Sequence, residues 1–179
     1  LPWVEATFRY SDIRNRQFID TANSFADAGQ TLKDRGADLK VRVLDEQKYV
    51  PAVAIGLQDG VGTGLFDGEY VVASKRYRDF DFSLGLGWGN IGAAGDFENP
   101  FTLFSNSFEV RGGAVGKGGQ FSLGNYFSGP RVALFGGVEY TTPLKGLSLK
   151  LEYEGNDYQN DPRQNVLLQS TRFNYGFNY

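Results

Sequence analysis

Residues Glu69–Asn90 read EYVVASKRYRDFDFSLGLGWGN, and this stretch decides the fold. In its second half Phe80, Phe82, Leu84, Leu86 and Trp88 are separated by Asp81, Ser83, Gly85, Gly87 and Gly89. Successive side chains of a strand point to opposite faces, so this segment has one apolar face and one small or polar face. With a turn near 77–79, the stretch predicts a β-hairpin. In a soluble sheet the apolar face would pack on a core. In a transmembrane barrel the apolar face would lie against lipid, and the small polar face would line a wet lumen.

The same alternation recurs on both sides of the hairpin. It predicts strands over 4–10, 37–43, 49–57, 131–142, 147–153 and 171–179, which with the hairpin gives eight. In the hairpin's first strand the phase is ambiguous, because Val71, Ala73 and Tyr77 share a face with Lys75. The strands are roughly 9–11 residues long, the length that crosses a bilayer when tilted. The sequence predicts an all-β, antiparallel fold.

The connections between these strands alternate in length. Those near 45–48, 77–79 and 143–146 are short, whereas 11–36, 59–68, 91–130 and 155–170 are longer. Short turns at one end and longer loops at the other are typical of transmembrane barrels. Aromatic residues also lie near both strand ends, as expected where rings meet lipid headgroups: Trp3, Tyr49, Tyr77, Phe80, Tyr140 and Tyr179 on the short-turn side, and Tyr10, Trp88, Tyr153 and Phe173 on the long-loop side.

Charged residues of both signs lie opposite the apolar faces. Buried without partners they would each cost several kcal/mol, so the face that they share must be wet. A barrel lumen satisfies this requirement, and the charges can pair there across strands. A soluble meander with a solvated face is the alternative. In a lumen, the residues expected to contact a substrate are Arg9, Lys40, Arg42, Asp81, Glu139, Lys150, Glu152 and Arg172.

Composition excludes several classes of function. The net charge of −3 provides no basic surface for nucleic acid. With no histidine and no cysteine, the Ser-His-Asp and Cys-His catalytic sets and the usual zinc ligands are excluded. The chain contains no run of 18 apolar residues, so no transmembrane helix is predicted. We therefore expect no catalytic residues, no metal and no cofactor. The chain also lacks methionine, which favours a segment of a longer protein over a complete one.

The 91–130 connection is unusually long and rich in aromatic residues. Phe97, Phe101, Phe104 and Phe108 recur at helical spacing, with Asn99 as a possible cap, Pro100 in the first turn and Gly112-Gly113 as an end signal. We expect a short amphipathic helix lying across the barrel mouth or inside it. The aromatic residues form either a small core of the loop's own or a sugar-stacking surface, and the small core is favoured. A short helical turn is also expected around Ser24–Thr31.

Five blocks of the chain resemble a known family. They are DRGADLK (34–40), YVPAVAIGL (49–57), GTGLF (62–66), EYVVASKR (69–76) and GLGWG (85–89). In this order they are similar to the YjbH family, also called the GfcD-like group, of outer-membrane β-barrel proteins associated with exopolysaccharide or capsule export. The likeness is dense over residues 1–90 and resumes over 131–179. Family members are much longer, so the chain resembles a portion of one.

The resemblance implies a function that composition alone does not. It implies that residues 1–179 are a segment of a single transmembrane β-barrel domain of the bacterial outer membrane, in which about eight strands of a larger barrel are visible. That barrel would export an extracellular polysaccharide without enzymatic activity. Its partners would be outer-membrane lipid, the polysaccharide and other proteins of the export system, with no nucleic acid. A general porin for small solutes is the alternative, and an outer-membrane enzyme acting on polysaccharide is a third class.

Overall fold

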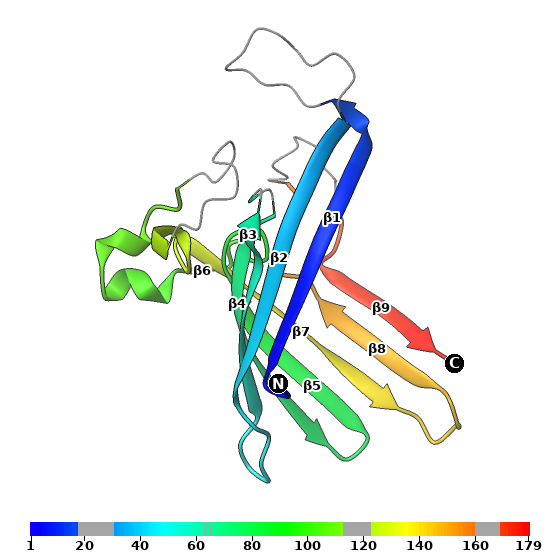
Figure 1. Cartoon of the computed structure of the whole chain (residues 1–179). Coiled ribbons are helices and arrows are strands. Elements are labelled where there is room, and N and C mark those ends of the chain that lie inside the picture. Colours follow the sequence, from blue (N-terminus) through cyan, green and yellow to red (C-terminus); the bar gives the residue numbers. More distant parts are fainter. Residues whose placement is uncertain (18–30, 63, 65, 113–122, 160–168) are drawn as a thin grey trace, which may run out of the picture.

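The computed structural model describes residues 1–17, 31–62, 64, 66–112, 123–159 and 169–179. These residues form a nine-stranded antiparallel sheet with the order β1-β2-β3-β4-β5-β7-β8-β9, and the short β6 pairs with β7 (Figure 1). The strands are β1 (Val4–Gln17), β2 (Thr31–Leu44), β3 (Ala52–Gly62), β4 (Gly68–Tyr77), β5 (Phe80–Gly87), β6 (Phe97–Glu98), β7 (Arg131–Thr141), β8 (Ser148–Tyr153) and β9 (Phe173–Asn178). The prediction of an all-β antiparallel fold is confirmed.

The first hairpin is longer than its hydrophobic pattern predicts. The β1–β2 register runs from Val4 opposite Val41 to Ile13 opposite Leu32, so residues 11–17 and 31–36 of the expected loop are strand. Polar residues pair in this extension, including Ser11 with Asp34, and the backbone ladder continues where side-chain alternation has ended. The helical turn expected around Ser24–Thr31 lies outside the described residues, except that Thr31 itself begins β2.

The register places most of the large apolar side chains of the long strands on one face. One row runs Ile55, Val71, Leu86 and Leu134, and the next runs Val53, Ala73, Leu84 and Gly136. Residues that are directly opposite in neighbouring strands share a face. Many of these side chains are exposed, including Leu84 at 61% and Tyr175 at 91%. Among the described residues, the buried hydrophobic side chains are Ala54, Trp88, Val132 and Ala133, so the sheet has little core of its own.

Lys75 is the exception on the apolar face, and it resolves the ambiguous phase of β4. It lies opposite Phe82, in phase with Val71 and Ala73. Its Nζ lies 2.9 Å from Oε1 of Glu46 in the β2–β3 turn. This hydrogen bond to Lys75 lowers the pKa of the Glu46 carboxyl. The cation therefore reaches the short-turn end of the sheet, where a long side chain can keep its charge hydrated.

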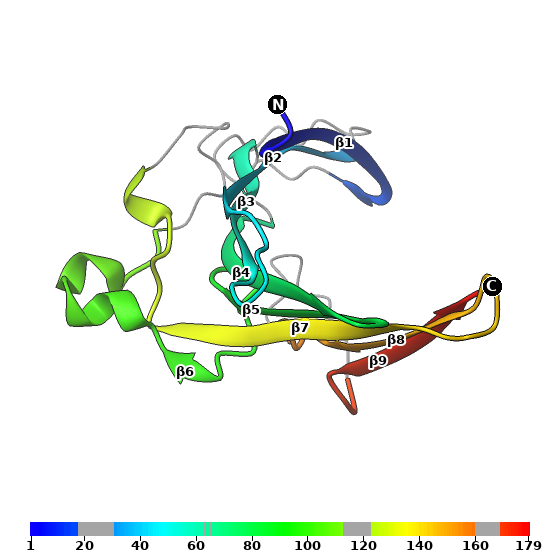
Figure 2. The ribbon, with the colours of Figure 1, turned by 90° about the horizontal axis from the view of Figure 1, so that it is seen from below.

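Figure 2 shows that the sheet is strongly curved, from β1 and β2 through β3 and β4 to β7, β8 and β9. Trp88, which continues the apolar row of β5, packs on Phe101 and Phe127, whose segments lie outside this curve. The apolar face is therefore convex, and the face with the small and polar side chains is concave. Within the described chain no pairing joins β1 to β9, so the sheet is open. The tight turns near 45–51, 78–79 and 142–147 lie at one end, opposite the longer connections, as the sequence predicts (Figure 1).

From residue 97 onward, the described part of the 91–130 connection packs on the convex side of the sheet, near its long-loop end. It contains the short 3₁₀ helices η1 (Pro100–Leu103), η2 (Asn106–Phe108) and η3 (Leu123–Asn125). Their segments lie outside the curve in Figure 2. Trp88, which continues the apolar row of β5, is 2% exposed beneath them. We call residues 97–111 and 123–130 the side platform.

For this connection one expectation is confirmed and two are corrected. Asn99 does cap a helix that starts at Pro100, because its side chain accepts from the N–H of Phe101. The helix ends after one turn, since Ser105 accepts from the N–H of Ser107 and starts η2. A continuous amphipathic helix is therefore wrong, and so is its expected position at the mouth or inside the lumen.

The side platform contains a small aromatic core, as the sequence analysis favoured. The ring centroids of Phe101 and Phe127 lie 5.5 and 5.1 Å from that of Trp88, and Phe108 packs on Phe101. Trp88 therefore does not belong to an exposed aromatic girdle, unlike Tyr77 and Tyr49, which are exposed near strand ends; Tyr10 is also exposed but lies within the extended β1. Among the described residues, no helix is long and apolar enough to cross a membrane.

Candidate functional site

The concave face is the candidate site, because it gathers the polar side chains of eight paired strands. Arg9, Lys40, Arg42, Asp81, Glu139, Lys150 and Glu152 all occupy positions that alternate with the apolar rows. The register brings Asp81, Glu139 and Lys150 directly opposite one another on β5, β7 and β8. Seven of the eight predicted residues therefore share one surface.

The charges on this face pair across strands, as the sequence predicts. Lys40 Nζ lies 3.8 Å from Glu5 Oε2, and Lys150 Nζ lies 3.5 Å from Glu139 Oε2. Asp81 Oδ1 lies 3.9 Å from Arg76 Nε. These partly exposed pairs are loose and add little stability, typically between 0 and about 1 kcal/mol. Their main effect is to cancel charge locally along a hydrated wall.

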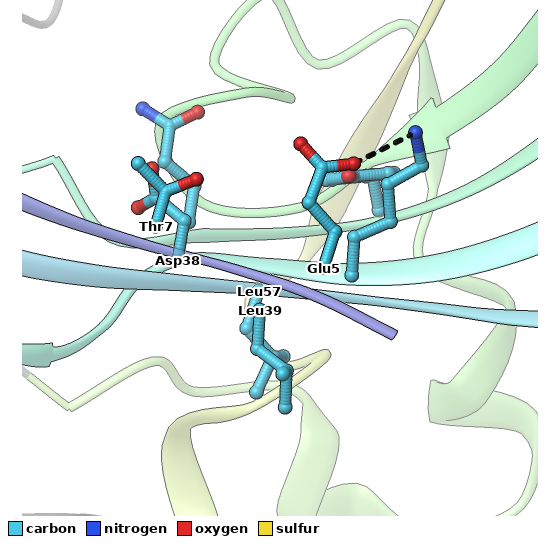
Figure 3. A pocket seen from close by; sticks show the side chains of 8 residues that line it. Glu5, Thr7, Asp38, Leu39 and Leu57 are labelled. Atoms are coloured by element: carbon cyan, nitrogen blue, oxygen red, sulfur yellow. Dashed lines mark ion pairs between the residues drawn. The ribbon is translucent and has the colours of Figure 1, made fainter. Parts of the chain in front are cut away.

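A hollow of about 240 Å³ lies on this face beside β1 and β2. Figure 3 shows Glu5, Thr7 and Asp38 pointing to one side of the strands, with Leu39 and Leu57 on the other. Lys40, Gln58 and Tyr70 complete the lining. The polar and apolar side chains thus point to opposite faces of the sheet, as their alternation in the sequence predicts.

Two of the predicted cations are turned towards the ends of the sheet. Arg42 lies at the short-turn end, where its Nε is 2.8 Å from Asp45 Oδ1 and its Nη2 donates to the carbonyl of Pro2. Arg9 lies near the other end, where its Nη2 is 3.2 Å from Oδ2 of the buried Asp34. Arg9 is positioned by a neighbour in the β1–β2 hairpin, and Arg42 is positioned by the β2–β3 turn and the segment before β1.

Arg172 is placed differently from the prediction. It precedes β9, and its two terminal nitrogens bind the carboxylate of Asp96 at 2.6 and 2.9 Å. It also donates to the carbonyls of Glu154 and Leu134, and it stacks over the ring of Tyr153. The hydrogen bond from Arg172 lowers the pKa of Asp96. The structure makes Arg172 a clamp between chain segments near the long-loop end and leaves it little capacity for a substrate.

Sequence reasoning missed two aromatic side chains at the centre of the concave face. Tyr70 lies over Gly56, where an added Cβ would be 2.1 Å from the Tyr70 Cζ. Phe135 lies over Gly85 in the same way, at 2.4 Å. A signal was present, since both aromatic residues fall in the phase of the small and polar positions. Only the register shows that each faces a glycine on a neighbouring strand.

A buried ion pair beneath the side platform was also missed. Arg111 binds both oxygens of Glu69 at 2.8 Å and Asp67 Oδ2 at 2.7 Å, and Glu69 is 1% exposed. Burial alone would lower the pKa of Arg111, but its bonds to Glu69 and Asp67 raise it above the usual value. Asn99 adds further links, because its amide accepts from Trp88 Nε1 and donates to the carbonyls of Phe127 and Gly129. These contacts fix the platform to the sheet.

The concave face can therefore bind by hydrogen bonds, ring contacts and compensated charge. In the ranges that the structure describes, no group of three or more acidic residues is placed to hold a metal ion. Glu152 lies in β8, whereas Glu154 follows the strand, and its Oε2 lies 3.5 Å from the Tyr158 hydroxyl.

Comparisons with known proteins agree on one family. The family model YjbH, described as "Exopolysaccharide biosynthesis protein YbjH", matches residues 1–179. A protein of Escherichia coli (strain K12) described as "Uncharacterized lipoprotein YjbH" is 47% identical over 178 residues, which are 99% of this chain and 25% of that protein. The chain thus spans a quarter of the length of this relative. No solved structure matches significantly.

Proposed function

This chain belongs to the YjbH family, and on that premise we propose that it forms part of the wall of an outer-membrane β-barrel that exports an extracellular polysaccharide. The family description concerns exopolysaccharide biosynthesis, and export is the step that a curved sheet with a polar inner face suits best. The remaining strands of the barrel would come from other parts of the longer protein. The proposal assigns no bond-making or bond-breaking step to this chain.

One observation carries the proposal: the polarity of the curved sheet is inverted relative to that of a soluble one. Leu84, Phe82 and Leu151 are exposed on the convex face, while Asp81, Lys150 and Glu152 lie on the concave face. A soluble meander would cover its large apolar side chains. A barrel wall places them against lipid and keeps the charges in a wet lumen. Closure also removes the open strand edges of β1 and β9, which lipid does not tolerate.

Polymer movement requires contacts that form and break easily. The pairs Lys40–Glu5 and Lys150–Glu139 provide donors and acceptors to sugar hydroxyls while keeping the local field small. A passing polymer then meets many weak sites instead of one deep trap, which is the requirement for conduction through a pore. Lipid outside, polysaccharide inside and other export proteins at the ends are the partners that we propose.

A membrane location draws support from the relative. The E. coli protein is described as a lipoprotein, and covalent lipid favours attachment of a protein to a membrane. We propose the bacterial outer membrane for the protein that contains this chain. The exposed convex face would lie against the lipid of that membrane.

The proposal is tested by deletion and complementation in a strain that secretes the polymer. Loss of the gene should abolish or strongly reduce secreted polysaccharide while cell-associated polymer accumulates, and the wild-type gene should restore secretion. Replacing Lys40, Arg42 and Lys150 together by glutamine should alter export of an acidic polymer more than that of a neutral one, because charge on a pore wall acts on a passing anion. Unchanged secretion in the deletion strain would overturn the export function.

A general porin is the second candidate, because the same mixed-charge concave face would pass small solutes without any partner. Planar-bilayer recordings on the full-length protein separate the two. An open porin conducts steadily in the absence of polymer, whereas an export conduit should show conductance that added polysaccharide blocks. Steady conductance with normal secretion in the deletion strain would favour the porin.

A further inference from the structure

We propose that Tyr70, Phe135 and Tyr158 form a binding subsite for uncharged pyranose residues at the bend of the concave face. We call these three side chains the aromatic corner. The inference rests on the proposed export of polysaccharide and deepens it, because it names the chemical class of sugar and the residues that contact it. It uses a hollow and a set of side chains that differ from the charged pairs described above.

The corner is built where the sheet bends between β4 and β7 (Figure 2). Tyr70 covers Gly56 on one side of the bend, and Phe135 covers Gly85 on the other. Their ring centroids are 6.0 Å apart with an interplanar angle of 87°. Because glycine has no side chain, each ring can lie close against the backbone of its neighbouring strand. Two nearly perpendicular aromatic surfaces therefore line the inside of the bend.

A hollow of about 330 Å³ opens beside these rings. Its lining consists of Gln58, Tyr70, Asn90, Ile91, Phe135, Glu154, Asn156 and Tyr158. The side chains include three aromatic rings, three amides and one carboxylate. Tyr70 also lines the first hollow, so the two hollows meet at this ring.

The third ring is held by local hydrogen bonds. Asn156 is largely buried, and its Oδ1 accepts from the N–H of Tyr158 at 2.8 Å. Tyr158 adopts a φ of 56°, which a bulky residue rarely does without support. Its hydroxyl lies 3.5 Å from Glu154 Oε2, and the Asn156 amide lies 3.4 Å from Asn90 Oδ1. The polar groups are thus positioned together with the ring.

This combination matches a pyranose. A pyranose presents a face of C–H groups, which packs on an aromatic ring, and a rim of hydroxyls, which pair with amides and carboxylates. The described lining of the hollow contains Glu154 and no lysine or arginine. A uronic acid would place its carboxylate near Glu154 without a cation to offset the repulsion. The corner therefore selects neutral sugar residues.

The test uses the full-length protein in detergent and saturation-transfer NMR, with aromatic protein protons irradiated. The probes are cellotetraose, galactotetraose and tetragalacturonate. At least one neutral probe should show transfer to its ring C–H protons, and tetragalacturonate should show much less. Replacing Tyr70 by leucine, which still covers Gly56, should weaken neutral-probe affinity about tenfold, equivalent to roughly 1.4 kcal/mol. The matched control is Tyr140→Leu, an aromatic residue on the convex face of β7.

A second variant keeps the test valid where Tyr70→Leu fails to fold. Tyr158→Ser changes a partly exposed residue outside the strands, and it should also reduce saturation transfer severalfold. Absence of neutral-probe binding to the wild type, or equal binding by wild type and a folded Tyr70→Leu or Tyr158→Ser variant, would overturn the subsite. The secretion assay tests the export function separately from the subsite. If polymer export depends on the gene but the corner variants do not change sugar binding, the subsite is disproved and the export function is retained.

Discussion

Two acid–base pairs in this molecule have the same chemistry and opposite surroundings. Glu139 and Lys150 face each other on neighbouring strands of the concave face, 3.5 Å apart and partly exposed. Glu69 and Arg111 are 42 residues apart in the chain, bind through two 2.8 Å contacts and lie beneath the side platform. The first pair sits on a wet wall, whereas the second holds a folded loop against the sheet.

The difference shows that the environment decides what a charge pair does. On the hydrated wall, solvent screens the attraction, so either partner remains available to a passing ligand. Under the platform, Glu69 is removed from water and depends on Arg111 and the N–H of Phe127 for compensation. Loss of one partner there leaves an uncompensated buried charge. The comparison predicts a graded series of mutational effects.

The largest effect is expected for Arg111→Ala. It should destabilise docking of the side platform by about 3–5 kcal/mol, because Glu69 then stays buried without its cation. Hydrogen exchange of the amides in 97–108 should accelerate by at least about a hundredfold. Glu109→Ala, an exposed neighbour, is the control and should leave exchange unchanged. Full protection in Arg111→Ala would show that the aromatic contacts alone hold the platform.

The next effect compares adjacent positions of β5 on opposite faces. Leu84→Arg should destabilise the folded protein in lipid by about 2–4 kcal/mol, because it places charge on the convex face. Ser83→Arg, on the concave face, should cost much less. Gly85 is unsuitable as the control, since any Cβ there would meet Phe135 at 2.4 Å. Unfolding of the full-length protein in lipid vesicles measures the stability of both variants. Equal stability of Leu84→Arg and Ser83→Arg would contradict the proposed barrel.

A moderate, pH-dependent effect is expected for the Asp96–Arg172 clamp. Arg172 lowers the pKa of Asp96 in the folded state, so the clamp stabilises the fold above the unfolded-state pKa of about 3.9. This contribution is lost as pH falls through the lowered pKa. Asp96→Asn should therefore reduce stability by about 1 kcal/mol at pH 7, and the difference from wild type should shrink towards pH 2. A difference that is constant with pH would contradict an ionic role.

The smallest effect is expected on the concave wall. Lys150→Gln should change stability by less than about 1 kcal/mol, because the Glu139–Lys150 pair is loose and exposed. It should still shift the anion-to-cation permeability ratio of the proposed pore of the full-length protein towards cations. Bilayer recordings under a salt gradient measure this ratio. A large loss of stability without a change in selectivity would mean that the pair is structural, like Glu69–Arg111.

Sequence reasoning succeeded where side-chain period reports directly on geometry. The alternation from Phe80 to Trp88 predicted the two faces, and the lengths of the connections predicted that the turns gather at one end. Seven predicted polar residues share the concave face because strand parity is conserved across an antiparallel register. The extension of β1 and β2 was missed, because its ladder is made by the backbone and carries no hydrophobic period.

Other features depended on contacts between distant segments. Glu69 and Arg111 gave no local signal, since their partners lie elsewhere in the chain. Asn99 was predicted as a cap, but its bonds to Trp88, Phe127 and Gly129 were not. The Phe97–Phe108 spacing suggested one helix, but Ser105 restarts the backbone and Phe97 joins β6. Arg172 has the parity of the concave face, yet it lies before β9, where Asp96 captures it. The alternation of side chains along a strand predicts the face on which a residue lies. It does not predict contacts with residues of a loop.

The glycines beneath Tyr70 and Phe135 link the diameter of the proposed pore to its choice of cargo. Without a Cβ at Gly56 and Gly85, two strands can curve inward and two rings can settle against them. The residues that set the curvature of the wall are then the same residues that contact the sugar. A mutation at these positions that alters the curvature of the wall should therefore also alter its contact with the sugar. On the proposed export function, we expect family members that export different polymers to differ also in pore diameter.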